Sequence, residues 1–78
     1  MDEEVSIILG DAIAFCQRDG QDARLINMLG QSRAISLTED TLTIEAPSRF
    51  AIAQLKKHQP TIEAYLEEIA FAPIALDI

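Results

Sequence analysis

The spacing of apolar residues changes three times along this chain, and each change limits the folds open to it. The first stretch follows the i, i+3, i+4, i+7 rule of a helix with one buried stripe, at Val5, Ile8, Leu9, Ala12, Phe15 and Cys16. We therefore predict a helix over residues 4–18, with Gly20 as its left-handed cap. Acids at positions 2–4 suit the positive end of its dipole. Gly10 lies mid-helix, where glycine costs about 1 kcal/mol relative to alanine, and only a closely passing backbone would explain it.

A second, shorter helix is predicted from Asp22 to Leu29. Asp22 suits its N-cap, because an aspartate side chain accepts a hydrogen bond from a free N–H of the first turn. Leu25, Ile26 and Leu29 recur at helical spacing and form its buried side. Gly30 follows them directly, so we expect the helix to stop there.

The period then drops to alternation, which is typical of strands with one buried face. Residues 34–37 and 42–46 show this pattern, and the short segment 38–40 separates them. A separation this short favours a tight turn between neighbouring strands. The sequence therefore predicts an antiparallel hairpin.

A helical period returns after the hairpin. Pro47 and Ser48 close the second strand, and Ser48 is the predicted N-cap of a helix that runs to about His58. Pro60 breaks or kinks this helix, because proline lacks the N–H that a helix interior requires. A further helical segment is predicted over residues 61–70.

The last segment, residues 74–78, alternates again and is predicted to be a third strand. The resulting order is α-α-β-β-α(α)-β, with the helices grouped apart from the hairpin. This order is typical of an α+β domain with a compact two-layer architecture and a three-stranded sheet. We expect residues 1–78 to form one complete domain without linkers or repeats.

Composition narrows the class of protein. With 78 residues and 49% apolar residues, the chain can bury one modest core and is too apolar for a disordered acidic tail. The formal net charge of −7 argues against a phosphate-binding surface as its main role. The chain has no apolar run of about 18 residues, and its first residues are acidic where a secretory signal is basic. A soluble, cytoplasmic domain is expected.

Residues that carry enzyme chemistry are few and isolated. His58 is the only histidine and stands beside Lys56 and Lys57 at a predicted helix end, which suits a carbonyl cap better than a catalytic base. Cys16 lies on the apolar stripe and is predicted to pack as a small hydrophobe. As the single cysteine it permits neither an internal disulfide nor a cysteine-based metal site. We therefore expect no catalytic residue, no cofactor and no metal.

Two apolar residues lie off the predicted buried faces. At 100° per residue, Ile7 lies almost opposite Val5, so it is either a single exposed isoleucine or a contact for a partner. Phe50 lies about 140–160° from Ile52 and Leu55 on its helix. It either packs against the end of the strand or is presented to a partner.

The third binding feature is basic. Four residues share it, Arg49, Lys56, Lys57 and His58. In a domain of net charge −7, so few cations would bind phosphate weakly and with strong salt dependence. A solvated helix face is the expected reading.

The stretch from Asp40 to Phe50 resembles the centre of the N-terminal domain of DnaA, the bacterial replication initiator. That family carries a strand of the form T-L-x-L-x-A-P, then a polar residue, then a Phe that leads into a helix. The matching residues here are Thr41, Leu42, Ile44, Ala46, Pro47, Arg49 and Phe50, with Ser48 in place of the usual Asn. The order of elements also matches that family's fold, which is related to the K-homology (KH) arrangement. The resemblance implies a domain that self-associates and contacts the replicative helicase or regulators, with ATPase and origin-binding domains following in a longer parent chain.

The chain departs from that family at two places. The family usually has an aromatic residue on the first helix and a Trp on the second, whereas this chain has no Trp, and Ile7 or Ile13 would fill the first position. The family's partner-binding acid on the second helix has no secure counterpart. Asp22 is the nearest acid, and Arg24-Leu25 occupies the register itself.

A second family also resembles this chain, the C-terminal part of the gamma/tau clamp-loader subunit of bacterial DNA polymerase III. Its pattern includes a Leu-rich second helix, an Ile-Glu-x-x-Leu segment and a Pro-Ile-x-Leu ending. Residues 23–26, 62–66 and 73–76 fit that description. This resemblance implies an interaction domain of the replisome as well.

We therefore expect a non-catalytic protein-interaction module of bacterial DNA replication, most like the initiator domain. The predicted partner-binding residues are Phe50, Arg49, Ile7 and Asp22. Phe50 is predicted to contact the helicase or another replisome component, and Ile7 to support self-association. No membrane or small molecule is expected as a partner. The alternatives are the gamma/tau domain, a KH-like binder of single-stranded nucleic acid, which lacks the family's G-x-x-G clamp here, and a stand-alone structural protein.

Overall fold

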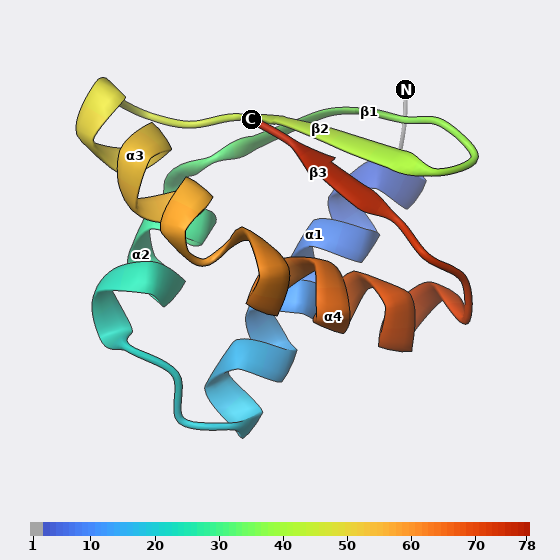
Figure 1. Ribbon diagram of the computed structural model, residues 1–78, viewed down its shortest axis with the longest axis horizontal. Helices are drawn as coiled ribbons and strands as arrows, with labels where there is room; N and C mark the ends of the chain where they lie inside the picture. Colours follow the sequence, from blue (N-terminus) through green and yellow to red (C-terminus); the bar gives the residue numbers. More distant parts are fainter. Residues whose placement is uncertain (1–2) are drawn as a thin grey trace.

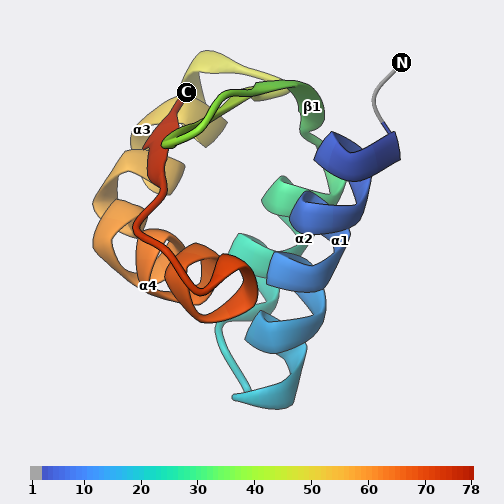
Figure 2. The ribbon, with the colours of Figure 1, turned by 90° about the vertical axis from the view of Figure 1, so that its right-hand side faces the viewer.

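A computed structural model describes residues 3–78. Its elements are, in chain order, α1 Glu3–Arg18, α2 Ala23–Gln31, β1 Arg33–Leu37, β2 Thr41–Glu45, α3 Arg49–Lys57, α4 Gln59–Ala70 and β3 Ala75–Asp77. The sheet lies across one side of the four helices (Figure 1). Figure 2 shows α1 and α2 beneath one side of the sheet and α4 beneath the other. The predicted α+β class and element order are confirmed; the expected dipole contribution of Asp2 lies outside the described residues.

The three strands form one mixed sheet in the order β1-β2-β3. β1 and β2 are antiparallel, and the N–H of Thr38 donates to the carbonyl of Thr41 at 2.9 Å to close the predicted hairpin. β3 pairs in parallel with β2, with Leu76 opposite Leu42. A parallel neighbour requires a crossover, and α3 and α4 supply it across the helical layer.

A β-bulge interrupts the predicted alternation of β1. The register with β2 slips between Ala34 and Ser36, so Ile35 is an extra residue on β1. Ile35 is 44% exposed, whereas Ala34 and Leu37 pack against the core. Simple alternation would place Ile35 and Leu37 on the same face of the sheet. Because of the bulge, Ile35 is exposed while Leu37 packs against the core.

The core lies between the sheet and the helices. Its α1 members are the predicted stripe residues Val5, Ile8, Leu9, Ala12 and Cys16, all buried, while Phe15 is half-buried against them. The other buried members of the core are leucines and isoleucines of α2, β2, α3, α4 and β3, together with Tyr65 and Ile74. β1 contributes none. The prediction that Cys16 packs as a hydrophobe is confirmed, and burial, followed by the nearby charge of Asp19, raises the pKa of its thiol.

Three of the predicted helix ends are confirmed by their geometry. The Asp22 side chain accepts from the N–H of Arg24 at 2.8 Å, and the Ser48 hydroxyl accepts from the N–H of Ala51 at 3.1 Å. Gly20 has a φ of 68°, the left-handed conformation expected after α1. These ends follow from local chemistry alone.

The prediction that Gly30 ends α2 is wrong. The helix continues to Gln31, and Ser32 is its C-cap. The N–H of Ser32 donates to the carbonyl of Leu29 at 3.1 Å, and its hydroxyl donates to the carbonyl of Met28 at 2.8 Å. Glycine permits a helix to end but does not require it, whereas Ser32 supplies the hydrogen bonds of the end.

The break between the third and fourth helices is confirmed, at His58. The N–H of His58 donates to the carbonyl of Leu55 at 3.1 Å and so caps α3. Pro60 lies in the first turn of α4, where the backbone has no need of its missing N–H. Pro60 therefore helps to begin α4 as well as to interrupt the preceding helix.

A polar network, here called the α1–α4 clasp, joins the end of α1 to α4. It comprises Phe15, Arg18, Asp19, Gln21, Tyr65 and Glu68. The Tyr65 hydroxyl donates to Asp19 at 2.8 Å and accepts from Gln21 at 3.0 Å. The Tyr65 ring meets Phe15 edge-on, with centroids 6.1 Å apart. The clasp holds the α1–α2 connection against α4.

A second polar contact fixes β3. The Glu63 carboxylate accepts from the N–H of Leu76 at 2.8 Å and from the Gln59 side chain at 2.9 Å. Gln59 also donates to the carbonyl of Leu76 at 2.8 Å. The backbone bond from Leu76, followed by the bond from Gln59, lowers the pKa of Glu63.

No helix within residues 3–78 has the length and apolar character needed to cross a membrane.

Candidate interaction surfaces

Phe50 stands in the first turn of α3 and is 69% exposed. Ala51 and Leu55 are buried and hold the inner face of α3 against the rest of the domain. Phe50 precedes Ala51 by one residue, so its side chain is rotated by about 100° from that face. The alternative that Phe50 packs against the end of the strand is therefore wrong.

A groove runs beside Phe50 between α2 and the start of α3. Its volume is about 360 Å³, and it is lined by Arg24, Asn27, Met28, Gln31, Pro47, Ser48, Phe50 and Ala51. We call it the Phe50 groove. Half of these side chains are apolar and half are polar, and two helices with capped N-termini position them. This mixture is typical of a surface that takes an apolar side chain inside a polar rim.

Four exposed cations lie around this groove or along α3, Arg24, Arg49, Lys56 and Lys57. None of them forms an ion pair within the described part of the chain. Residues 46–62 contain no Asp or Glu. At 100° per residue, Lys57 lies about 20° from Phe50 and Ala53 about 60° from it, so one exposed stripe of α3 joins them. A domain of net charge −7 thus carries a cationic face around its exposed ring.

The other predicted site residues do not join this groove. Asp22 is exposed, and its carboxylate already caps α2 through the N–H of Arg24. Ile7 is 59% exposed on α1 and lines neither the Phe50 groove nor the groove described next. Arg49 is exposed beside Phe50 in sequence. The structure therefore places Phe50 and the unpredicted Arg24 in one groove, leaves Arg49 next to Phe50 in sequence but outside the groove lining, and leaves Ile7 on another element.

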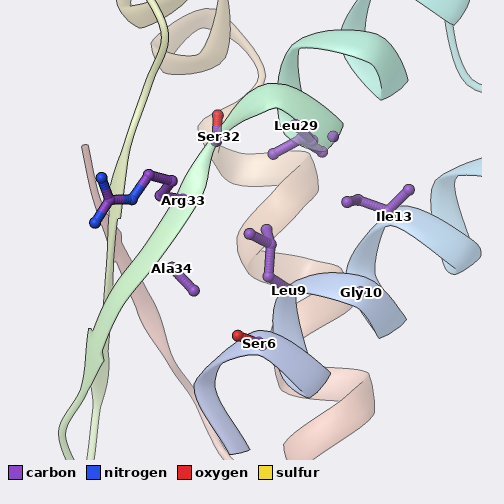
Figure 3. Close-up of a pocket in the computed structure, with 9 residues that line it drawn as sticks. Ser6, Leu9, Gly10, Ile13, Leu29, Ser32, Arg33 and Ala34 are labelled. Carbon is purple, nitrogen blue, oxygen red and sulfur yellow. The ribbon is translucent and has the colours of Figure 1, made fainter. Parts of the chain in front are cut away.

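A second groove of about 400 Å³ lies between α1, the end of α2 and β1 (Figure 3). Leu9 and Leu29 point toward each other there, whereas the Arg33 side chain points away from α1. Gly10 and Gly30 also line this groove, and a Cβ added at either would meet nothing within 4 Å. A closely passing backbone therefore does not explain Gly10, because a Cβ there would meet open space.

Sequence reasoning missed Phe71. It is 94% exposed directly after α4, and its φ of 60° is positive, where a bulky residue costs roughly 1 kcal/mol or more. Its N–H donates to the carbonyl of Glu67 at 2.8 Å and so caps the helix. Helical phase contains the signal, since Phe71 comes nine residues after the buried Ile62 and falls on the opposite side at 100° per residue.

Asp19 and Tyr65, two titratable residues of the α1–α4 clasp, bond to each other. Hydrogen bonds from Arg18, followed by the bond from Tyr65, lower the pKa of Asp19. The bond from Gln21 lowers the pKa of Tyr65, but burial and Asp19 together outweigh it and the net shift is upward. Within residues 3–78, no three of the His, Cys, Asp and Glu side chains are placed to hold a metal ion.

Comparison of the sequence with protein-family models finds no matching family. Comparison with characterised proteins finds no match either. The likeness to the initiator domain therefore rests on the stretch from Asp40 to Phe50 and on the order of elements.

Proposed function

We propose that this domain is a non-catalytic protein-interaction module of bacterial DNA replication and that the Phe50 groove is its contact surface. The observation that carries the proposal is the exposure of Phe50, 69%, at the edge of a groove of about 360 Å³. The ring adds nothing to the core, yet burying such a side chain against a partner is worth about 1.5–3 kcal/mol. Aromatic and Arg side chains are also the residues most often found at binding hot spots.

The positive charge near the Phe50 groove indicates which kind of partner would bind there. Arg24 lines the groove and Arg49 flanks Phe50, and neither has an ion-pair partner within residues 3–78. Such a surface favours a segment that offers an apolar side chain together with carboxylates. The resemblance to the initiator domain suggests that the partner is the replicative helicase; the resemblance to gamma/tau suggests another replisome component.

The direct test is capture of purified replicative helicase on the immobilised domain. We expect Phe50→Ala to weaken capture at least tenfold, because a hot-spot ring is removed. Arg49→Glu should weaken it as well. Phe71→Ala is the control, since it removes an exposed ring that does not line the groove. The circular dichroism of all variants should equal that of the wild type.

Two results would contradict this assignment. Equal capture by wild type and Phe50→Ala would remove Phe50 from the contact, and unfolding of Phe50→Ala would show that the ring stabilises the fold. If the domain captures clamp-loader or polymerase subunits in preference to the helicase, the gamma/tau alternative holds with the same surface. Ile7 remains the predicted residue for self-association through α1, which Ile7→Glu would test by sedimentation.

A second candidate function is binding of single-stranded nucleic acid, favoured by the four cations that accompany Phe50. An aromatic ring on which a base stacks, beside cations that track the backbone, is the usual arrangement of such sites. Four phosphate contacts would reduce affinity roughly 50-fold between about 50 and 200 mM salt. A filter-binding titration with a thymidine oligonucleotide at both salt concentrations measures this. Binding that is equally weak at both would exclude the candidate.

A further inference from the structure

Phe71 is the most exposed large apolar side chain among the described residues, at 94%. It also occupies a left-handed conformation that glycine adopts at no steric cost. Phe71 therefore has two unfavourable features for the stability of the domain: its ring is exposed to water, and its backbone is strained. The N–H of Phe71 caps α4 and so offsets part of the backbone cost, but the ring itself is almost wholly outside the domain.

The end of α4 that carries Phe71 is acidic. Glu67 lies one turn before Phe71, is exposed, and has no ion-pair partner within residues 3–78. Glu68 is exposed beside it and meets Arg18 at 3.4 Å. Phe71 is therefore an aromatic side chain flanked by carboxylates, which is the chemistry that the Phe50 groove favours.

The two features lie at opposite ends of the molecule. In Figure 1, whose horizontal direction is the longest axis, the start of α3 is at the left and the segment after α4 is at the right. The extent along that axis is 27 Å. The Phe71 end therefore cannot reach the Phe50 groove of its own chain.

We propose that copies of this chain associate head to tail, with Phe71 of one copy inserted into the Phe50 groove of the next. The proposal rests on the groove being a contact surface, as proposed above. Phe71 would pack against the Phe50 ring, because aromatic rings favour edge-on or offset contact. Glu67 would face Arg24 and Arg49, so that the acidic end of one copy meets the cationic face of the next.

This geometry makes the contact heterologous, because each junction uses two different surfaces. Such a contact extends into a chain of copies unless the rotation between them closes a ring. One ring and a few charges form a small interface, and small interfaces are typical of transient association. Association is therefore expected at high local concentration of the domain.

The test is sedimentation of the domain at chain concentrations up to about 1 mM, a range chosen because the interface is small. The wild type should show an average mass that rises beyond a dimer with concentration. Phe71→Gly and Phe50→Glu should each weaken association at least tenfold, the first by removing the inserted ring and the second by placing a carboxylate opposite Glu67. Phe71→Gly should also raise the thermal midpoint by about 4–8 °C, since glycine relieves the backbone strain.

An equimolar mixture of the two variants gives the sharpest result. Phe50→Glu retains Phe71 and Phe71→Gly retains the groove, so the mixture can form one productive junction. It should yield 1:1 dimers and nothing larger, although each variant alone stays monomeric. A symmetric contact between identical surfaces would not give this pattern.

Ile7→Glu separates this contact from self-association through α1, because Ile7 is exposed and does not line the Phe50 groove. The head-to-tail contact predicts that Ile7→Glu associates as the wild type does, whereas association through α1 predicts that it does not. The proposal is overturned if the wild type is monomeric throughout, if the mixture remains monomeric while the wild type associates, or if Ile7→Glu abolishes association. Helicase capture separates the two proposals. A monomeric wild type that still loses helicase through Phe50→Ala keeps the proposed function and removes the head-to-tail contact.

Discussion

Two helix junctions in this domain carry an aromatic side chain, and the fold uses the two rings in opposite ways. At the α1–α4 junction, Tyr65 is 7% exposed, meets Phe15 edge-on, and bonds through its hydroxyl to Asp19 and Gln21. At the α2–α3 junction, Phe50 is 69% exposed beside an open groove. The first junction is closed by its own side chains, and the second is open.

The difference comes from helical phase. Tyr65 lies three residues after the buried Ile62, about 60° from it at 100° per residue, so it shares the buried side of α4. Phe50 lies one residue before the buried Ala51 and points away from the inner side of α3. A ring in phase with the core stabilises the domain, whereas a ring out of phase keeps its apolar area available for a partner.

The largest effect on the free energy of unfolding is expected at the closed α1–α4 junction. Tyr65→Ala should lower the free energy of unfolding by about 3 kcal/mol, because it leaves a cavity beside Phe15 and removes both hydroxyl bonds. Phe50→Ala, the same truncation at the open junction, should change it by less than about 0.5 kcal/mol. Urea unfolding of both variants measures the difference. Similar losses for both would mean that Phe50 supports the fold.

A smaller effect on stability is expected at low pH, where the contact between Glu63 and β3 is lost. Because the pKa of Glu63 is lowered by its bonds to Leu76 and Gln59, its contribution is present above its ordinary pKa of 4.5 and is lost as pH falls through the lowered value. The contribution is about 1 kcal/mol, reduced by solvent screening. Thermal midpoints of wild type and Glu63→Gln should differ at pH 7 and converge as pH falls through the lowered pKa of Glu63. A constant difference across this range would show that the Glu63 charge does not anchor β3.

The smallest effect on the free energy of unfolding is expected at Gly10, which lines the second open groove of the domain (Figure 3). Gly10→Ala should raise the free energy of unfolding by about 0.5–1 kcal/mol, since alanine favours the helix and its Cβ meets nothing within 4 Å. Gly20→Ala is the matched control and should be destabilising, because Gly20 has a φ of 68°. Thermal unfolding of both variants measures these changes. Destabilisation by Gly10→Ala would show that α1 requires a closer packing there than the structure has.

Much of the fold could be predicted from local pattern. The helical spacing of Val5, Leu9 and Cys16 placed α1 correctly, and Asp22 and Ser48 were recognised as N-caps. Each of these features depends on residues within one or two helical turns. Gly30 was misjudged because the residue that ends α2 is Ser32, whose hydroxyl bonds to the preceding turn.

The candidate site was only half predictable. Helical phase indicated that Phe50 leaves the buried side of α3, and the same arithmetic would have found Phe71 had α4 been extended by one residue. The place of Arg24 in the Phe50 groove had no such signal. It depends on how α2 packs against α3, which spacing within either helix does not specify.

The sequence by itself determined the types of element, their order, the buried stripes and most helix caps, because these depend on side chains a few residues apart. The tertiary structure alone decided the parallel pairing of β3 with β2, the bulge at Ile35 and the placement of Arg24 beside Phe50. It also decided that the start of α3 and the segment after α4 lie at opposite ends of the domain (Figure 1). The physical reason is that these arrangements arise from contacts between residues far apart in the chain, where backbone pairing and packing of whole elements outweigh local preference.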